Sequence, residues 1–94
     1  MVGSVRNNTT EERYELEIDG VVAYVTYHRE HGHVSLDHTE VPPQLGGRGV
    51  GSALAQGTLD LVRAEGLKLI PRCEFIAGYI NKHPEYRDLV TDAR

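Results

Sequence analysis

Residues 46–52 read Gly46-Gly47-Arg48-Gly49-Val50-Gly51-Ser52, and the fold of the chain can be worked out from this stretch. Small or apolar residues recur after it at intervals of three and four, which is the spacing of one helix face. These residues are Val50, Ala53, Leu54, Gly57, Leu61 and Ala64. Glu65-Gly66 then gives a stop signal, because glycine readily adopts the left-handed backbone that ends a helix. The stretch therefore predicts a glycine-rich turn that opens a helix.

An antiparallel meander of three strands is predicted before this turn. From residue 13 to residue 19, apolar and charged side chains alternate, as in a strand with one buried face. Asp19-Gly20 is a two-residue hairpin signal, because both central positions of such a turn need positive φ. The returning strand covers 21–28, and a third strand covers 33–41 after a turn near 30–32. We expect Val34, Leu36 and His38 to share one face of this third strand, which Pro42-Pro43 ends.

The elements after the first helix complete a small α/β (α+β) fold. Residues 67–71 are short and apolar and predict a fourth strand, and the strand–helix–strand connection favours a parallel position beside the third strand. Apolar spacing over 75–83 predicts a short second helix that ends at Pro84. Residues 1–10 are polar and without periodicity, which predicts a mobile N-terminal arm. Residues 11–94 then form a single domain.

Composition and charge exclude several classes of protein. The chain has 94 residues, of which 39% are hydrophobic and 26% charged, as in a globular domain rather than a disordered segment. A formal net charge of −4 argues against a nucleic-acid partner. No apolar run approaches the about 20 residues that span a bilayer, so we expect no membrane partner. Because the N-terminus lacks an apolar signal region and there is a single cysteine, the expected location is cytoplasmic.

The glycine-rich turn is the strongest candidate for a functional site. Gly47, Gly49 and Gly51 leave backbone N–H groups uncovered at a helix N-terminus, where the helix dipole is positive and an anion such as a pyrophosphate fits. Arg48 adds a charged donor. The alternative is a loop whose glycines only permit a tight turn. Three alternating glycines exceed what a turn requires, so anion binding is the interpretation that we prefer.

Two common phosphate motifs do not fit this turn. A P-loop needs lysine after its last glycine, and Ser52 stands there. A dinucleotide fingerprint needs a third glycine or alanine, but Ser52 or Leu54 occupies that position, depending on which glycine starts the pattern. The strands before the turn are also predicted to be antiparallel. The anion is therefore expected to belong to another class of ligand.

The whole pattern resembles the GNAT acetyltransferase superfamily, which binds acetyl-coenzyme A. The resemblance is closer still to the short, single-domain GNAT-like proteins of the Yjdj type, and it covers residues 13–89. It is carried by the segments His38-Thr39-Glu40-Val41-Pro42-Pro43, Gly47-Arg48-Gly49-Val50-Gly51, Ile70-Pro71-Arg72-Cys73 and Lys82-His83-Pro84-Glu85-Tyr86. In the superfamily loop pattern (R/Q)-x-x-G-x-(G/A), Gly49 and Gly51 fill the last two positions, and Gly46 stands at the first.

The resemblance implies a minimal GNAT-like fold and a set of residues that bind acetyl-coenzyme A, with no metal. It implies that the backbone of the third strand pairs with the pantetheine and that the turn and helix hold the pyrophosphate. The far end of the coenzyme is expected near the second helix, with a solvated helix face as the alternative. The expected binding residues are Thr39, Glu40, Val41, Gly46, Gly47, Arg48, Gly49, Val50, Gly51, Ser52, Tyr79, Lys82 and His83.

Cys73 and His38 are the candidate catalytic residues. Cys73 follows the fourth strand, at the mouth of the slot that the resemblance implies for the thioester, and His38 is a candidate base for the thiol or for an amine substrate. The alternatives are purely structural roles, as a buried cysteine and as a histidine packed in the strand face. Direct transfer to the amine and relay through an acetylated Cys73 both remain open.

The expected function is acetyl transfer from acetyl-coenzyme A to an unidentified amine, and the alternative is a coenzyme A-binding module without turnover. The full superfamily fold carries further helices that shape the acceptor site, for which 94 residues leave no room. We therefore expect an acceptor pocket that is open or is completed by a protein or another large substrate. His28, His31 and His33 gather near a turn, but no carboxylate or cysteine at a recognised spacing completes a metal site.

Overall fold

A five-stranded sheet forms the base of the molecule in a computed structural model that describes residues 4–91. Residues 1–3 of the expected arm and residues 92–94 of the expected domain lie outside the described residues. The strands follow one another across the sheet in chain order. They are β1 Arg6–Asn8, β2 Arg13–Ile18, β3 Val21–Glu30, β4 His33–Glu40 and β5 Lys68–Pro71.

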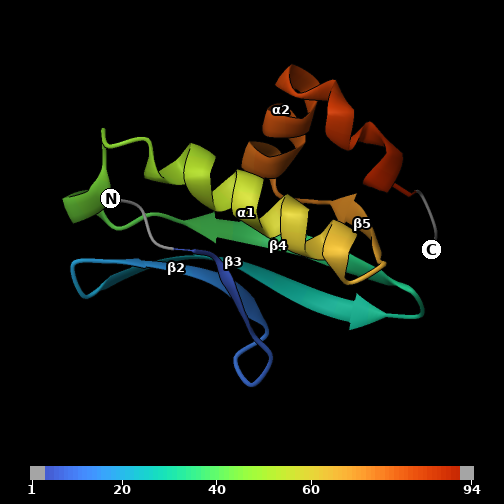
Figure 1. Ribbon diagram of the computed structural model, residues 1–94, viewed down its shortest axis with the longest axis horizontal. Helices are drawn as coiled ribbons and strands as arrows, with labels where there is room; N and C mark the ends of the chain where they lie inside the picture. The colour runs from blue at the N-terminus through green and yellow to red at the C-terminus, as the bar shows by residue number, and fades with distance from the viewer. Residues whose placement is uncertain (1–3, 92–94) are drawn as a thin grey trace.

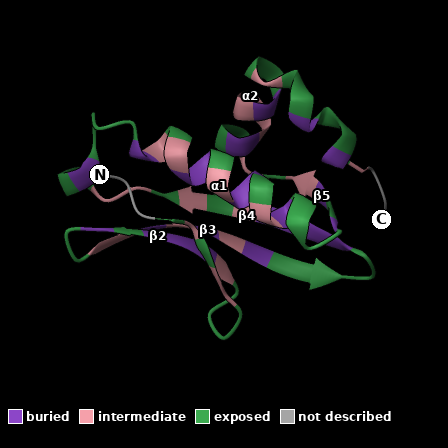
Figure 2. Cartoon of the chain, in the orientation of Figure 1, coloured by how far each residue is buried: buried purple, intermediate pink, exposed green. Residues whose placement is uncertain are grey.

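The helices lie on one side of this sheet. Helix α1 spans Val50–Ala64 and α2 spans Glu74–Lys82, and Figure 1 shows both above the strands. Two 3₁₀ helices, η1 Pro43–Leu45 and η2 Pro84–Leu89, precede α1 and follow α2. The core fills the space between the layers, where Figure 2 shows buried residues on the facing sides of helix and sheet. Among its fully buried side chains are Leu16, Val25, Leu36, Leu54, Leu59 and Leu69.

The predicted meander and its first hairpin are confirmed. Strands β2, β3 and β4 pair antiparallel in sequence order. Asp19 and Gly20 between β2 and β3 have φ values of 54° and 78°, so both central residues of the turn are left-handed, as the Asp-Gly signal requires.

The predicted parallel fourth strand is also confirmed, and the α/β (α+β) class with it. Strand β5 pairs parallel with β4 from His33↔Lys68 to Leu36↔Pro71, after the crossover through α1. No further pair joins the two strands beyond Leu36, although the backbone N–H of Cys73 still donates to the Leu36 carbonyl at 2.9 Å. Strand β5 therefore ends at this point, while β4 continues to Glu40 and α2 begins at Glu74.

An irregularity in β4 alters the predicted strand faces. Tyr27 pairs with Leu36 and Thr26 pairs with His38, so Asp37 is an extra residue with no opposite partner in β3. Such a bulge reverses the alternation of side chains beyond it. The prediction that His38 shares a face with Val34 and Leu36 is therefore wrong. His38 lies on the outer face, and Thr39, which pairs with buried Val25, lies on the face toward the helices.

Strand β1 replaces part of the expected arm. Arg6 pairs with Glu15, and Asn8 pairs with Arg13, so this segment extends the sheet beyond β2. Side chains hold it in place, because Arg6 and Asn8 both donate to the buried carboxylate of Glu15. An apolar pattern could not predict this strand, since its sequence is Arg-Asn-Asn.

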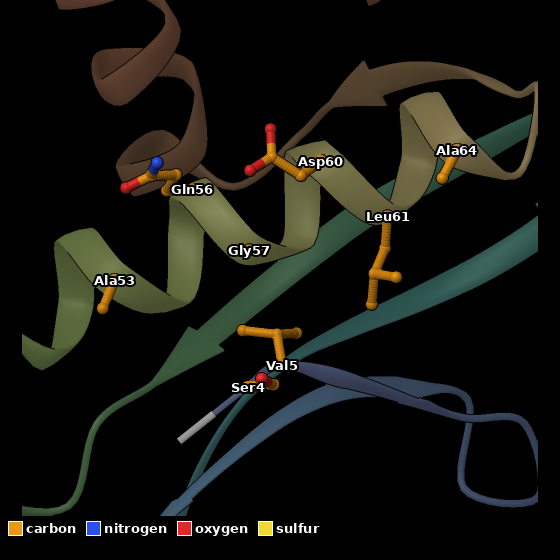
Figure 3. Close-up of a pocket in the computed structure, with 8 residues that line it drawn as sticks. All are labelled: Ser4, Val5, Ala53, Gln56, Gly57, Asp60, Leu61 and Ala64. Atoms are coloured by element: carbon orange, nitrogen blue, oxygen red, sulfur yellow. The ribbon is translucent and has the colours of Figure 1, made fainter. Parts of the chain in front are cut away.

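The N-terminal segment also packs against α1. Figure 3 shows Val5 facing Gly57, where a shallow groove runs along the helix. A side chain on Gly57 would collide with Val5, because a Cβ there would lie 2.7 Å from the Val5 Cβ. The groove is lined by Ser4, Val5, Ala53, Gln56, Gly57, Asp60, Leu61 and Ala64. The small residues of the predicted apolar stripe thus form the flank of α1 beside this segment.

Candidate functional site

The N-terminus of α1 exposes backbone N–H groups in the way that the glycine pattern predicts. Gly47 and Gly49 have φ values of 75° and 71°, and Gly49 is the N-cap residue of the helix. Among the residues that the structure describes, no side chain caps this end, and the first turn contains no acidic residue. The N–H groups of Val50, Gly51 and Ser52 have no acceptor within the helix. Together with the helix dipole, they form an environment that favours an anion.

Gly46 and Arg48 have other contacts. The N–H of Gly46 donates to the Pro43 carbonyl at 3.0 Å and closes η1. The Arg48 guanidinium lies 3.3 Å from the Asp19 carboxylate in an exposed ion pair. The Arg48 side chain therefore points toward the β2–β3 turn. The environment that favours an anion consists of main-chain N–H groups.

A cavity of about 290 Å³ lies between the first turn of α1 and one side of α2. Four of the predicted binding residues line it: Ser52, Tyr79, Lys82 and His83. The His83 ring stacks on Tyr79 with centroids 3.9 Å apart, and its Nδ1 lies 2.9 Å from the Tyr79 carbonyl oxygen. Residues that are distant in sequence thus form one wall beside the glycine-rich turn.

Phe75 is a residue of this cavity that the sequence pattern did not single out. Its side chain is 44% exposed, although it is large and apolar. A Cβ on Gly51 would come within 3.0 Å of the Phe75 ring, so glycine at this position lets the ring approach the helix N-terminus. The close approach could not be seen in the sequence, where Phe75 reads only as part of a helical stripe.

Cys73 lies just past the last pair of β4 and β5. It is the N-cap residue of α2, and its Sγ is 3.1 Å from the Thr39 Oγ1. Thr39 reaches it because the bulge at Asp37 turns the Thr39 side chain toward the helices. Val41, the last predicted residue of the strand segment, packs against the core. The thiol and the Thr39 hydroxyl therefore lie together at the β4 edge just past its last pair with β5, a position that we call the slot.

The structure does not bring His38 and Cys73 together. The His38 side chain is 62% exposed on the outer face of β4, with its Nε2 3.0 Å from a Glu40 carboxylate oxygen. The polar partner of the Cys73 sulfur is Thr39. The Cys–His pair that the sequence suggested is absent among the described residues, and the cause is again the reversed alternation after Asp37.

The histidines near the β3–β4 turn have individual partners. His28 Nδ1 lies 2.7 Å from Asp37, and His33 Nδ1 lies 3.2 Å from the His31 carbonyl oxygen. Within residues 4–91, no group of three or more side chains could hold a metal ion. Among the helices of that same span, none is long and apolar enough to cross a membrane.

Comparisons with known proteins identify the fold and the family of the chain. The solution structure of a GCN5-like protein from Staphylococcus aureus superposes with a TM-score of 0.66 and 26% identity, covering 100% of this chain and 90% of that one. Protein NATD1 from Homo sapiens and from Mus musculus is 43% identical over 51 residues, which are 54% of this chain. The chain spans about half the length of these relatives, 45% and 46%. The family model for GCN5-related N-acetyltransferases matches residues 13–89, and the chain belongs to that family.

Proposed function

We propose that the protein transfers an acetyl group from acetyl-coenzyme A to an amine. The observation that carries this proposal is the uncapped first turn of α1, whose Ser52 shares a cavity with Glu74 and Phe75, the residues that follow Cys73. A coenzyme with its diphosphate on the Gly49–Ser52 amides can place its thioester near Cys73. Membership of the acetyltransferase family supports the same assignment.

The rest of the coenzyme would follow the walls of the site. The β4 edge over residues 39–41 has no partner from β5, so its backbone groups are available to the pantetheine amides. Lys82 and His83 border the cavity beside α2, and the lysine ammonium offers a partner for the phosphate at the adenosine end. Acetyl-coenzyme A supplies the activated acetyl group, and the chain supplies amides, the slot and a thiol.

Two routes for the acetyl group suit this slot. In direct transfer, the amine attacks the thioester carbon and loses a proton to a base, and the Cys73 thiol can protonate the departing sulfur. In relayed transfer, the Cys73 sulfur takes the acetyl group first, and the amine then attacks the enzyme thioester. The Thr39 hydroxyl holds the sulfur in place in both cases. His38 is the base suggested by the sequence, although it lies on the opposite face of β4.

The binding site is tested by a coenzyme A titration followed through backbone amide NMR shifts. We expect the largest shifts at Val41 and at residues 47–52. Gly49→Asp should abolish binding, because a carboxylate would occupy the anion environment. Gly32→Asp is the matched control, since Gly32 has a φ of 73° and the same open surroundings but lies in the β3–β4 turn. Equal binding by Gly49→Asp and the parent would place the anion elsewhere.

The transfer reaction is tested with acetyl-coenzyme A labelled in its acetyl group and an added amine. Label that moves to the amine in the parent and in Cys73→Ala indicates direct transfer. Label that appears on the parent protein, and no transfer by Cys73→Ala, indicates the relay. Coenzyme binding without movement of label would reduce the protein to a binding module.

A further inference from the structure

A chain of polar contacts crosses the outer face of the sheet, the face turned away from α1 and α2. His28 on β3 lies with its Nδ1 2.7 Å from Asp37 Oδ2. The other Asp37 oxygen accepts a hydrogen bond from the Ser35 hydroxyl, which in turn accepts one from Arg72 Nε at 3.0 Å. The contacts therefore link β3, β4 and the residue that follows β5.

This series of polar contacts ends beside Cys73, at the slot. Asp37 is the extra residue of the β4 bulge and comes directly after Leu36, the last residue paired with β5. Arg72 comes directly before Cys73, whose N–H binds the Leu36 carbonyl. The Asp37 carboxylate thus stands at the outer mouth of the slot, on the side where no described helix covers the sheet (Figure 1).

His28 has the geometry of an oriented base. The contact of Nδ1 with Asp37 fixes the ring orientation and keeps the proton of the neutral ring on Nδ1, so that Nε2 is left as the acceptor. The His28 side chain is 72% exposed, and Nε2 is open to a second substrate. His38 differs, because its own Nε2 is the atom that contacts Glu40.

The two faces of the sheet suggest where each substrate approaches. A coenzyme bound at the α1 N-terminus reaches the slot from the helix side, so an amine must reach the thioester from the outer side. We propose that His28, oriented by Asp37, is the general base that takes a proton from this acceptor amine. This assignment rests on the proposed acetyl transfer.

The two protons that the acceptor nitrogen loses go to different groups. The acceptor arrives as an ammonium ion and gives one proton to His28 Nε2, which becomes an imidazolium beside the Asp37 carboxylate. The amine nitrogen forms its bond to the acetyl carbon, the carbon–sulfur bond breaks, and the second proton lost by nitrogen ends on the departing sulfur. His28 then releases its proton to solvent, because the imidazole is exposed.

Charged groups around His28 set the pH at which this base works. The hydrogen bond that His28 donates to Asp37 is the main cause that raises the pKa of His28 above 6.5, and the charges of Asp37, Glu12 and Glu30 act in the same direction. Arg72, the cation in the contact chain, is separated from the ring by Ser35 and Asp37. Since the neutral ring accepts the proton, the transfer rate should rise with pH through this raised pKa.

The experiment measures thiol release from acetyl-coenzyme A with poly-L-lysine as the amine, from pH 5.5 to 9.5. His28→Gln should lower kcat about 100-fold and remove the rising limb of the profile of rate against pH. The Kd for coenzyme A should stay within twofold of the parent value. Asp37→Asn should move the limb to lower pH, because the ring loses its anionic partner. His31→Gln is the control, because His31 is exposed in the β3–β4 turn and belongs neither to the outer-face contacts nor to the proposed coenzyme site.

Several results would overturn the assignment. One is a parent protein that transfers acetyl, together with a His28→Gln variant that has the same kcat and the same rise of rate with pH. Another is loss of the limb in His38→Gln instead. NMR titration of the His28 ring gives a readout that needs no acceptor, and a midpoint that Asp37→Asn leaves unmoved also contradicts the proposal. Failure of the parent to bind coenzyme A would instead refute the proposed function itself.

Discussion

Glu15 is a carboxylate that the fold buries on the outer side of the sheet. Its side chain is 2% exposed and accepts hydrogen bonds from Arg6 at 2.9 Å, from Asn8 at 3.0 Å and from Arg13. Burial opposes its ionisation, but the bonds from Arg13 and Asn8 and the nearby guanidinium charges outweigh burial and lower its pKa below 4.5. Ionised Glu15 therefore joins β1 to β2.

We predict that Glu15→Gln lowers the free energy of unfolding at pH 7 by about 2 kcal/mol, the scale of a hydrogen-bonded buried charge. Because the folded pKa is the lower one, this contribution is complete above pH 4.5 and is lost as the pH falls through the folded value. Urea unfolding at pH 7 and pH 3 measures the difference. Glu17→Gln is the control, since Glu17 is 48% exposed in its side chain. Equal losses for the two variants would contradict the prediction.

The contacts of single residues were the part of the candidate site that was hardest to predict from the sequence. The backbone requirement at Gly49 is local, so the glycine pattern alone predicted it, and its φ of 71° agrees. The partner of Cys73 is not local. The bulge at Asp37 exchanges the faces of His38 and Thr39, and no residue in the segment signals an extra position.

Helix α1 carries a glycine at its midpoint for a reason that lies outside the helix. Gly57 lets Val5 pack against the backbone, and a Cβ there would overlap a Val5 methyl group. Alanine is the better helix former by about 1 kcal/mol. The sign of a substitution at residue 57 therefore depends on Val5.

We predict that Gly57→Ala destabilises the protein, by about 1 kcal/mol or more, because Val5 must leave its position. In a Val5→Gly background, which removes both the methyl groups and the Cβ of residue 5, the same change should be neutral or stabilising. Gly78→Ala is the matched control, because Gly78 lies within α2 and no atom would come within 4 Å of a new Cβ. Chemical unfolding of the variants measures each effect, and a stabilised Gly57→Ala single variant would refute the packing argument.

Among the elements, those with a local signal were predicted well. The β2–β3 hairpin and the α1 boundaries follow from turn residues and periodicity. Strand β1 has no such local signal, since contacts with Glu15 and Glu65 hold it. Asn7 donates to Glu65, which lies 58 residues further along the chain. Helix η2 is also set from a distance, as Arg63 and Asp60 on α1 bind Asp88 and Tyr86.

At the scale of the molecule, buried phenols connect elements that are distant in sequence. The Tyr14 hydroxyl donates to Glu65 at 2.9 Å, and the Tyr86 hydroxyl donates to Asp60 at 2.8 Å. Burial, with these acceptors, raises the pKa values of Tyr14 and Tyr86 above 10.0. Burial also raises the pKa values of Tyr27 and Tyr79. The folded state therefore keeps phenol protons that the unfolded chain releases near pH 10.

We predict that the protein loses stability above pH 10, because the folded state then binds more protons than the unfolded state. Each shifted tyrosine contributes a slope of up to about 1.4 kcal/mol per pH unit. Below pH 10 the same groups contribute their full stabilisation. Urea unfolding at intervals from pH 8 to 11.5 measures the slope, and Tyr14→Phe should reduce it. A flat profile would show that the phenols titrate alike in both states.

The β4–β5 pair has a consequence for the order in which the protein folds. Every other pair of named strands in residues 4–91 joins strands that a short turn connects, so it closes only a short loop. The parallel pair must wait for the whole crossover, and closing it costs the most chain entropy. Because Cys73 meets Leu36 and Thr39 only after this closure, we expect the candidate site to form late in folding, after the antiparallel meander.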